Sequence, residues 1–123
     1  MVFDTDVLIW TLRGNEKAAR VIEQDGDRSV SIISCMELYR GARDKREMAV
    51  IRRFLLDFET IPLSGEISYR GCLYMEQYAL RIDLTPLDAL IAATAMERQQ
   101  LFCTGNARHF RQVADLDVQA FRP

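Results

Sequence analysis

The sequence predicts an α/β fold, a three-layer α/β/α sandwich with a central, mainly parallel sheet. Three short apolar runs have strand character, namely Val2–Phe3, residues 29–34 and residues 101–104, and stretches of helical periodicity lie between them. Strands that alternate with helices pair in parallel through right-handed crossovers, so the helices cover both faces of the sheet. Residues 59–63 (ETIPL) are a further short strand candidate. We expect residues 1–123 to form a single domain.

The boundaries of the expected helices follow from residues that start or stop helices. Short oxygen-bearing side chains cap helix N-termini, glycine ends helices in a left-handed conformation, and proline is harmless at the first helical position. The expected helices are one from near Val7 to Gly14 with Thr5 or Asp6 as its cap, one from Asn15 to Gly26, two within residues 34–58 that are separated near Gly41 to Asp44, one opened by Ser64, and one capped by Thr85 with Pro86 at its first position.

The composition is that of an ordinary globular protein, with 49% hydrophobic residues, 28% charged residues and a net charge of -2. No apolar stretch approaches the roughly 20 residues of a membrane span, and no basic segment leads into an apolar core at the N-terminus. We therefore expect a cytoplasmic protein without a membrane segment. Cys35, Cys72 and Cys103 are too widely spaced for a zinc site or a disulfide framework, and each is expected to be a small buried residue.

Three acids stand where the predicted fold forms sites, beyond the carboxyl ends of parallel strands. Asp4 ends the first strand, Glu37 lies one turn into the helix after residues 29–34, and Asp88 lies in the first turn of a helix that can face the same edge. Each acid also has a structural explanation. Asp4 can simply end the strand. Glu37 can face solvent or pair with Arg40, and Asp88 is favoured by the helix dipole.

Gathered at one edge, the three carboxylates would repel one another, and a divalent metal ion would relieve that repulsion. Oxygen ligands without His or Cys favour Mg²⁺ or Mn²⁺ over zinc. Such an ion lowers the pKa of a bound water and stabilises charge on a phosphate that undergoes in-line displacement. The sequence therefore predicts phosphoryl or phosphodiester chemistry, with Asp4, Glu37 and Asp88 as catalytic residues and metal ligands.

Four polar residues are auxiliary candidates. Asp6 is a second acid beside Asp4, as an auxiliary acid or a cap. Thr104 and Asn106 follow the last apolar run and can position acids or water, although a helix cap is the favoured role for Asn106. His109 is the only histidine, and a single imidazole is more often a surface or packing residue than a ligand or base.

The cations are fourteen Arg and only two Lys, and Arg pairs with phosphate in bidentate fashion. Arg40, Arg43 and Arg46 lie in the densest cationic stretch, RGARDKREMAVIRRF. A solvated helix face is the usual explanation of such a stretch, and contact with RNA is the alternative.

Four stretches resemble the PIN domain, specifically the VapC-type toxins of bacterial toxin–antitoxin pairs. They are MVFDTDVLIW, SIISCMELYRGA, LTPLDALIAATA and TGNARHF, in this order and across nearly the whole chain. The resemblance implies a Mg²⁺- or Mn²⁺-dependent endoribonuclease with an α/β/α sandwich. It also implies a homodimer that a small antitoxin neutralises by covering or blocking the acidic site.

The resemblance carries over to individual residues. Asp4, Glu37 and Asp88 match the family's core acidic ligands, Asp6 occupies a polar position beside the first, and Thr104 and Asn106 match its T-x-N element. Many members have a further acid three residues after that Asn, where this chain has His109. The loss of a negative ligand predicts one tightly held ion, with a second arriving only with substrate.

Two other functions compete with the nuclease. FDTDVL also resembles the DxDx[TV] nucleophile motif of haloacid-dehalogenase-like phosphatases, although Leu8 departs from it and neither Lys17 nor Lys45 follows a predicted strand. The other competitor is a catalytically inactive PIN-like module that only binds partners, since fold alone does not establish activity. The three intact acids argue against that module.

Overall fold

Five short strands form one sheet in the computed structural model, which describes every residue from Met1 to Pro123. The strands are β1 (Val2–Phe3), β2 (Ser29–Ser31), β3 (Glu59–Ile61), β4 (Phe102–Thr104) and β5 (Val118–Ala120). Their order is β3-β2-β1-β4-β5, and every neighbouring pair is parallel. The predicted α/β class is confirmed, with a sheet that is parallel throughout, and β5 is a strand that the sequence analysis missed.

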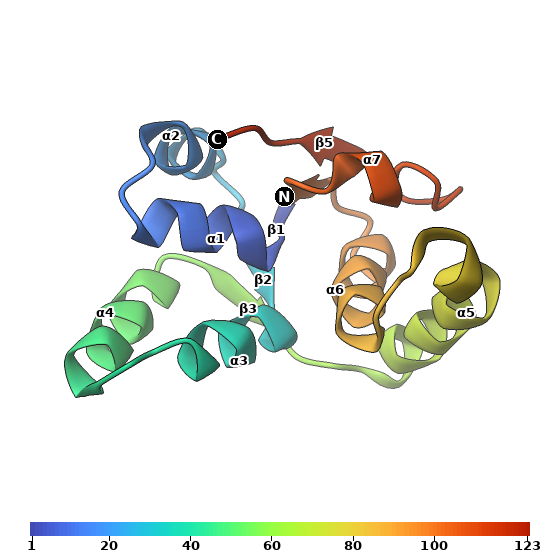
Figure 1. Ribbon diagram of the computed structural model, residues 1–123, viewed down its shortest axis with the longest axis horizontal. Helices are drawn as coiled ribbons and strands as arrows, with labels where there is room; N and C mark the ends of the chain where they lie inside the picture. The colour runs from blue at the N-terminus through green and yellow to red at the C-terminus, as the bar shows by residue number, and fades with distance from the viewer.

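Helices cover both sides of this sheet. They are α1 (Thr5–Leu12), α2 (Glu16–Gln24), α3 (Ile32–Arg40), α4 (Lys45–Leu55), α5 (Gly65–Ile82), α6 (Pro86–Glu97) and α7 (Ala107–Phe110). Figure 1 shows α1 to α4 on one side of the strands and α5 to α7 on the other, which gives the three predicted layers.

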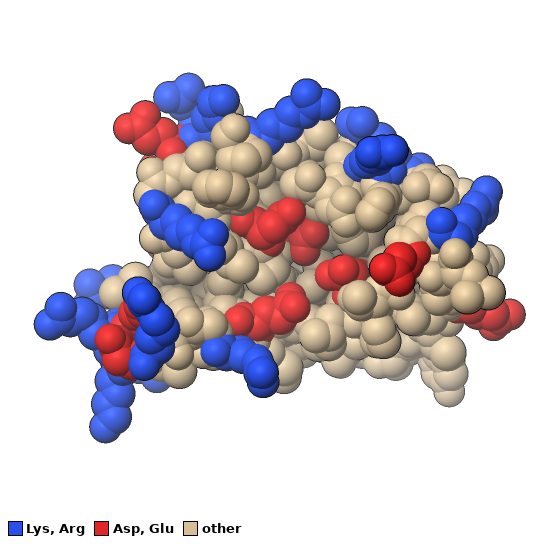
Figure 2. Space-filling model, in the orientation of Figure 1, with Lys and Arg blue, Asp and Glu red and all other residues tan.

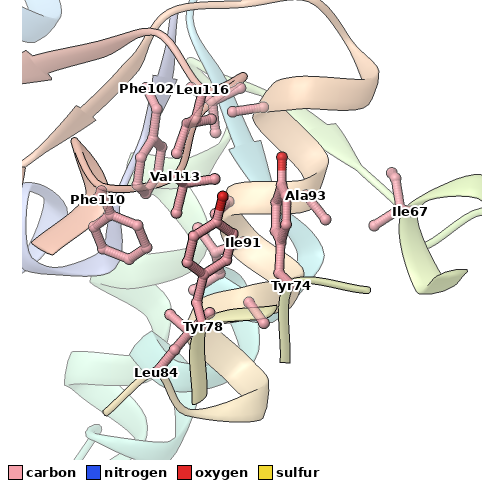
Figure 3. Packing of buried hydrophobic residues seen from close by; sticks show 14 of the residues in the cluster. Ile67, Tyr74, Tyr78, Leu84, Ile91, Ala93, Phe102, Phe110, Val113 and Leu116 are labelled. Atoms are coloured by element: carbon pink, nitrogen blue, oxygen red, sulfur yellow. The ribbon is translucent and has the colours of Figure 1, made fainter. Parts of the chain in front are cut away.

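The neighbouring strands β1 and β4 contribute to a core on each face of the sheet, because successive residues of a strand point to opposite faces. Val2 and Phe102 belong to the core beneath α5 and α6, and Figure 3 shows Phe102 beside Phe110 there, with ring centroids 5.0 Å apart. Phe3 and Cys103 belong to the core beneath α1, α2 and α4. Burial on both faces fixes β1 and β4, and with them the residues at their carboxyl ends.

Two predicted helix starts were wrong. The first helix begins at Thr5, and its cap is Asp4, whose carboxylate accepts a hydrogen bond from the Thr5 N–H, so neither Thr5 nor Asp6 is the cap. The strand expected over residues 29–34 ends at Ser31, whose hydroxyl accepts from the Ile33 N–H and opens α3. A serine that can cap a helix here outweighs the strand preference of the isoleucines after it.

Most other boundaries agree with the sequence. Asn15, Ser64 and Thr85 each cap a helix through a side-chain hydrogen bond, and Gly14 has the left-handed conformation (φ 90°) expected after a helix. Gly26 likewise lies two residues beyond its helix, α2, but it does not have the left-handed conformation expected of a glycine that ends a helix.

Two predictions about whole classes of residue can also be compared with the structure. Cys35 and Cys103 are buried as expected, whereas Cys72 is exposed on α5, contrary to the prediction. None of the helices combines the length and the apolar character needed to span a membrane.

Candidate active site

The candidate site lies at the carboxyl ends of β1 and β4, where the strand order changes direction. From β1 the chain continues to β2 on one side, and β4 lies on the other side. Such a switch point leaves a crevice in which ligands bind in open parallel sheets. Asp4 directly follows β1, and Thr104 is the last residue of β4.

Asp4 is held at both carboxylate oxygens. Its Oδ1 accepts from the Thr5 N–H at 2.8 Å, and its Oδ2 accepts from the Thr104 hydroxyl at 2.7 Å. The residue is only 7% exposed. Thr104 is itself fixed, because its hydroxyl oxygen accepts from the Asn106 N–H at 2.9 Å. The carboxylate therefore cannot turn away from its neighbours without breaking hydrogen bonds.

The surroundings of Asp4 disfavour its charge. Burial, followed by the neighbouring charge of Asp6 and to a smaller extent that of Asp88, raises the pKa of the Asp4 carboxyl to about 7, against the lowering effect of its hydrogen bonds. No Lys or Arg forms an ion pair with Asp4, Asp6, Glu37 or Asp88. The site therefore contains negative charge that the protein itself does not neutralise.

Asp6 lies in the first turn of α1 and faces the loop after β4. Its Oδ2 accepts from the Gly105 N–H at 3.0 Å, whereas its Oδ1 is buried without any hydrogen-bond partner. Burial is the main reason that the pKa of the Asp6 carboxyl is raised, and Asp88 adds to the effect. A Cβ at Gly105 would stand 2.5 Å from Asp6 Oδ2, so only glycine lets the carboxylate approach this closely.

Glu37 and Asp88 come to the site from two different helices. Glu37 is half-buried on α3, and its Oε1 accepts from the Thr5 hydroxyl at 2.7 Å instead of pairing with Arg40. Asp88 is half-buried in the first turn of α6, where its N–H donates to the capping Thr85 hydroxyl. The helix around it is buried as its small apolar residues suggested.

The donor chemistry fits a hard divalent cation. The acids offer carboxylate oxygens without a competing Lys or Arg, and one buried oxygen, Asp6 Oδ1, has no partner. Figure 2 shows acidic atoms gathered in the middle of one face, between α1, α3 and α6 of Figure 1, with Lys and Arg around the edge. The structure contains no group of three or more acids, His or Cys arranged to hold a metal ion, so the ligand set of Asp4, Glu37 and Asp88 stays a prediction.

The two polar residues of the T-x-N element contact different groups, since Thr104 binds Asp4 and Asn106 contacts His109. Asn106 is the N-cap residue of α7, as favoured from the sequence, but its side chain makes no capping hydrogen bond. Instead its Nδ2 lies 3.2 Å from His109 Nδ1, and both side chains are exposed. Because an amide nitrogen can only donate, His109 Nδ1 is the acceptor in this contact.

An apolar groove of about 650 Å³ runs beside the acids, between α1, α3 and α4. Ile9, Leu38 and Ile51 line it, and Glu37 lies on its wall. Of the three candidate RNA-binding arginines, Arg43 and Arg46 border this groove, whereas Arg40 does not. All three are exposed. Arg43 forms an ion pair with Glu47 at 2.9 Å, so its positive charge is partly neutralised and attracts a phosphate less strongly.

Three residues of the site were not singled out as site residues in the sequence. Thr5 contacts Glu37 directly, and Ser34 is linked to Glu37 through the Thr5 hydroxyl. The Gly105 N–H donates to Asp6. A threonine at a helix start, a helical serine and a loop glycine have ordinary explanations of their own. No signal in the sequence pairs them with the acids.

Known proteins resemble this chain over most of its length. The PIN domain family model matches residues 1–116. Ribonuclease VapC10 of Mycobacterium tuberculosis is 34% identical over 116 residues, which cover 89% of this chain and 85% of that protein. Ribonuclease VapC1 of Methanocaldococcus jannaschii is 25% identical over 122 residues, which cover 98% of this chain and 86% of that protein.

Solved structures show the same fold. A toxin–antitoxin complex from Klebsiella pneumoniae contains a chain with a TM-score of 0.83 and 28% identity, covering 97% of this chain and 95% of that one. DNA-bound VapBC from Salmonella typhimurium has a TM-score of 0.86 at 23% identity, covering 97% and 96% of the two chains. By the family match, the relatives and the fold together, this chain belongs to the PIN-domain family.

Proposed function

We propose that this protein is a Mg²⁺- or Mn²⁺-dependent endoribonuclease, a toxin of the VapC type. The observation that carries the proposal is the desolvated Asp4 carboxylate, which is crowded by Asp6 and Asp88 at the end of the sheet without a protein cation. Negative charge that is fixed in this way is suited to a divalent ion. The relatives named ribonucleases supply the substrate class.

Each residue has a distinct task in this proposal. Asp4 and Asp88 would hold the ion, and Glu37 would reach it directly or through a water molecule. When bound, the ion supplies an activated water and stabilises charge on the phosphodiester. Thr104 keeps Asp4 in place through its hydroxyl. With His109 in place of a further acid, we propose one tightly held ion and a second that arrives with substrate.

The partners are proposed from the solved structures that resemble this chain. These are toxin–antitoxin and VapBC complexes, so we propose a cognate antitoxin for this chain. From the resemblance to VapC-type toxins we also propose a homodimer and a cytoplasmic setting. The groove between α1, α3 and α4 suits an apolar antitoxin segment, which would reach the acids over Glu37. Arg40 and Arg46 carry no intramolecular ion pair and are available to RNA phosphates.

The phosphatase alternative has lost its support. The chain matches the PIN family over residues 1–116. Its two lysines, Lys17 and Lys45, are exposed at the starts of α2 and α4, and each of these helices follows another helix instead of a strand. If no RNA is cleaved, the inactive PIN-like module is the function that the experiment would favour.

Cleavage of an RNA pool in Mg²⁺ or Mn²⁺ tests the proposal. We expect products with 5′-phosphate and 3′-hydroxyl ends, loss of cleavage in EDTA, and loss of cleavage in Asp88→Asn without loss of fold. Asp57→Asn is the matched control, because Asp57 is exposed and its carboxylate makes no hydrogen bond or ion pair. Ends with a 2′,3′-cyclic phosphate, or full cleavage in EDTA, would refute the metal-activated water. Mn²⁺ binding without cleavage of any RNA would favour the inactive module.

A further inference from the structure

Thr5 makes contacts with two of the acids at once. Its backbone N–H donates to Asp4 Oδ1 at 2.8 Å, and its side-chain hydroxyl lies 2.7 Å from Glu37 Oε1. The same hydroxyl lies 2.9 Å from the hydroxyl of Ser34, one turn before Glu37 on α3. Thr5 is 9% exposed and Ser34 is fully buried, so water does not compete readily for these bonds.

The direction of these hydrogen bonds follows from proton counting. An ionised carboxylate can only accept, so the single hydroxyl proton of Thr5 goes to Glu37. The oxygen of Thr5 then accepts the proton of Ser34, which has no other side-chain partner. The result is a relay from Ser34 through Thr5 to Glu37, in which each bond polarises the next.

The relay compensates for the freedom of Glu37. A glutamate side chain has several rotatable bonds, and no Lys or Arg holds this one. Thr5 binds only its Oε1, and no protein group donates to Oε2, which stays available to a ligand. Because the amide of Thr5 binds Asp4 while its hydroxyl binds Glu37, one residue sets the spacing between acids from two elements of the fold.

We propose that Thr5 is a positioning residue that orients Glu37 relative to Asp4 for the metal-dependent reaction, with Ser34 supporting its hydroxyl. The inference rests on the proposed nuclease function. The competing explanation is that the two hydroxyls only join α1 to α3. In that case their removal would lower stability and leave metal binding by the folded protein unchanged.

Four variants separate these explanations. Thr5→Val removes the hydroxyl and keeps the shape, Thr5→Ser keeps the hydroxyl, and Ser34→Ala removes only the supporting donor. Thr11→Val is the matched control, because Thr11 lies on the same helix and its hydroxyl donates only to the Val7 carbonyl. Calorimetric Mn²⁺ affinity, kcat and KM for RNA cleavage, and urea unfolding in EDTA are measured for each.

We expect Thr5→Val to lose about 10- to 100-fold in Mn²⁺ affinity and kcat, as is usual when the partner of a metal ligand is removed. KM for RNA should stay unchanged. Ser34→Ala should lose less, and Thr5→Ser and Thr11→Val should remain within about threefold of the unmodified protein, a margin well below the loss expected for Thr5→Val. Equal Mn²⁺ affinity in folded Thr5→Val and the unmodified protein would overturn the proposal.

A double-mutant cycle adds a readout that a purely structural contact would not give. If Thr5 acts through Glu37, Thr5→Val should cause no further loss of Mn²⁺ affinity in a Glu37→Gln background. Additive losses would overturn the proposal. If Thr5→Val does not fold, Ser34→Ala replaces it in the same cycle with the same criterion. Absence of metal-dependent cleavage by the unmodified protein would refute the proposed function itself, whereas cleavage that is indifferent to the Thr5 hydroxyl would refute only its positioning role.

Discussion

Asp4→Asn is expected to stabilise the metal-free protein at neutral and alkaline pH, although it removes a residue of the site. Burial first, and Asp6 next, raise the pKa of the Asp4 carboxyl from 3.8 to about 7. The unfolded chain loses this proton near pH 3.8, and the folded protein loses it only near pH 7. Between these values the unfolded state binds fewer protons, so the free energy of unfolding falls as the pH rises.

The size of the effect follows from the pKa difference. About three pKa units at 1.36 kcal/mol each correspond to roughly 4 kcal/mol, reached in full above pH 7 and absent below about pH 4. Asparagine removes the charge and keeps the shape. Its Oδ1 can accept from the Thr5 N–H and its amide can donate to the Thr104 hydroxyl, but the buried Thr104 hydroxyl proton then loses its acceptor, which offsets part of the gain by about 1–3 kcal/mol.

Urea unfolding in EDTA between pH 4 and pH 8 measures this effect. The unmodified protein should lose stability across the range, and Asp4→Asn should lose much less, so that the two curves separate toward pH 8. Saturating Mn²⁺ should reverse their order, because the ion stabilises only the protein that binds it. Asp57→Asn, which changes an exposed acid, should follow the unmodified protein. An Asp4→Asn protein that is less stable at pH 8 in EDTA would show that Asp4 is a structural residue and refute the reasoning.

Three further substitutions test the surroundings of the acids. Gly105→Ala places a Cβ against Asp6 and should lower Mn²⁺ affinity about tenfold by calorimetry, whereas Gly26→Ala, with no atom within 4 Å of the added Cβ, should change nothing. His109→Ala should keep cleavage within about tenfold, since loss of a general acid or base costs 100-fold or more, and a larger loss in single-turnover assays would give His109 a catalytic role. Arg46→Ala should weaken RNA binding at low salt and reduce the slope of log affinity against log salt concentration by about one. An unchanged slope would show that Arg46 does not contact an RNA phosphate.

The layers of the fold were predictable because they depend on local patterns. Alternating apolar runs and amphipathic stretches specify parallel pairing, and caps such as Ser64 and Thr85 mark helix starts within a few residues. The edge strand Val118–Ala120 gave no such pattern, since its residues are half-buried or exposed. The start of α3 was missed because Ser31 both ends a strand and caps a helix, and only the three-dimensional path of the chain shows which of these residues continue the sheet.

The positions of the candidate acids in the fold were predictable, whereas their hydrogen-bond partners were not, and the role of the acids as metal ligands stays a prediction. Asp4, Glu37 and Asp88 could be assigned to one edge because the carboxyl ends of parallel strands meet there. Their orientation depends on contacts across long stretches of chain, such as Thr5 with Glu37 and Gly105 with Asp6. Contacts of this kind have no period in the sequence, so neither composition nor spacing could have identified them.

The local structure of α1 explains only one of the two acids in the opening DTD, Asp4 and Asp6. One carboxylate suffices to cap α1, and Asp4 does so. Asp6 is held to the Gly105 amide beside it, so the two carboxylates cannot separate to reduce their repulsion. Because hydrogen bonds fix both, only a bound proton or a bound cation can lower the energy of the pair, and the two must compete below about pH 7. The second acid therefore destabilises the empty site, and the same repulsion becomes attraction for the ion that the site is proposed to bind.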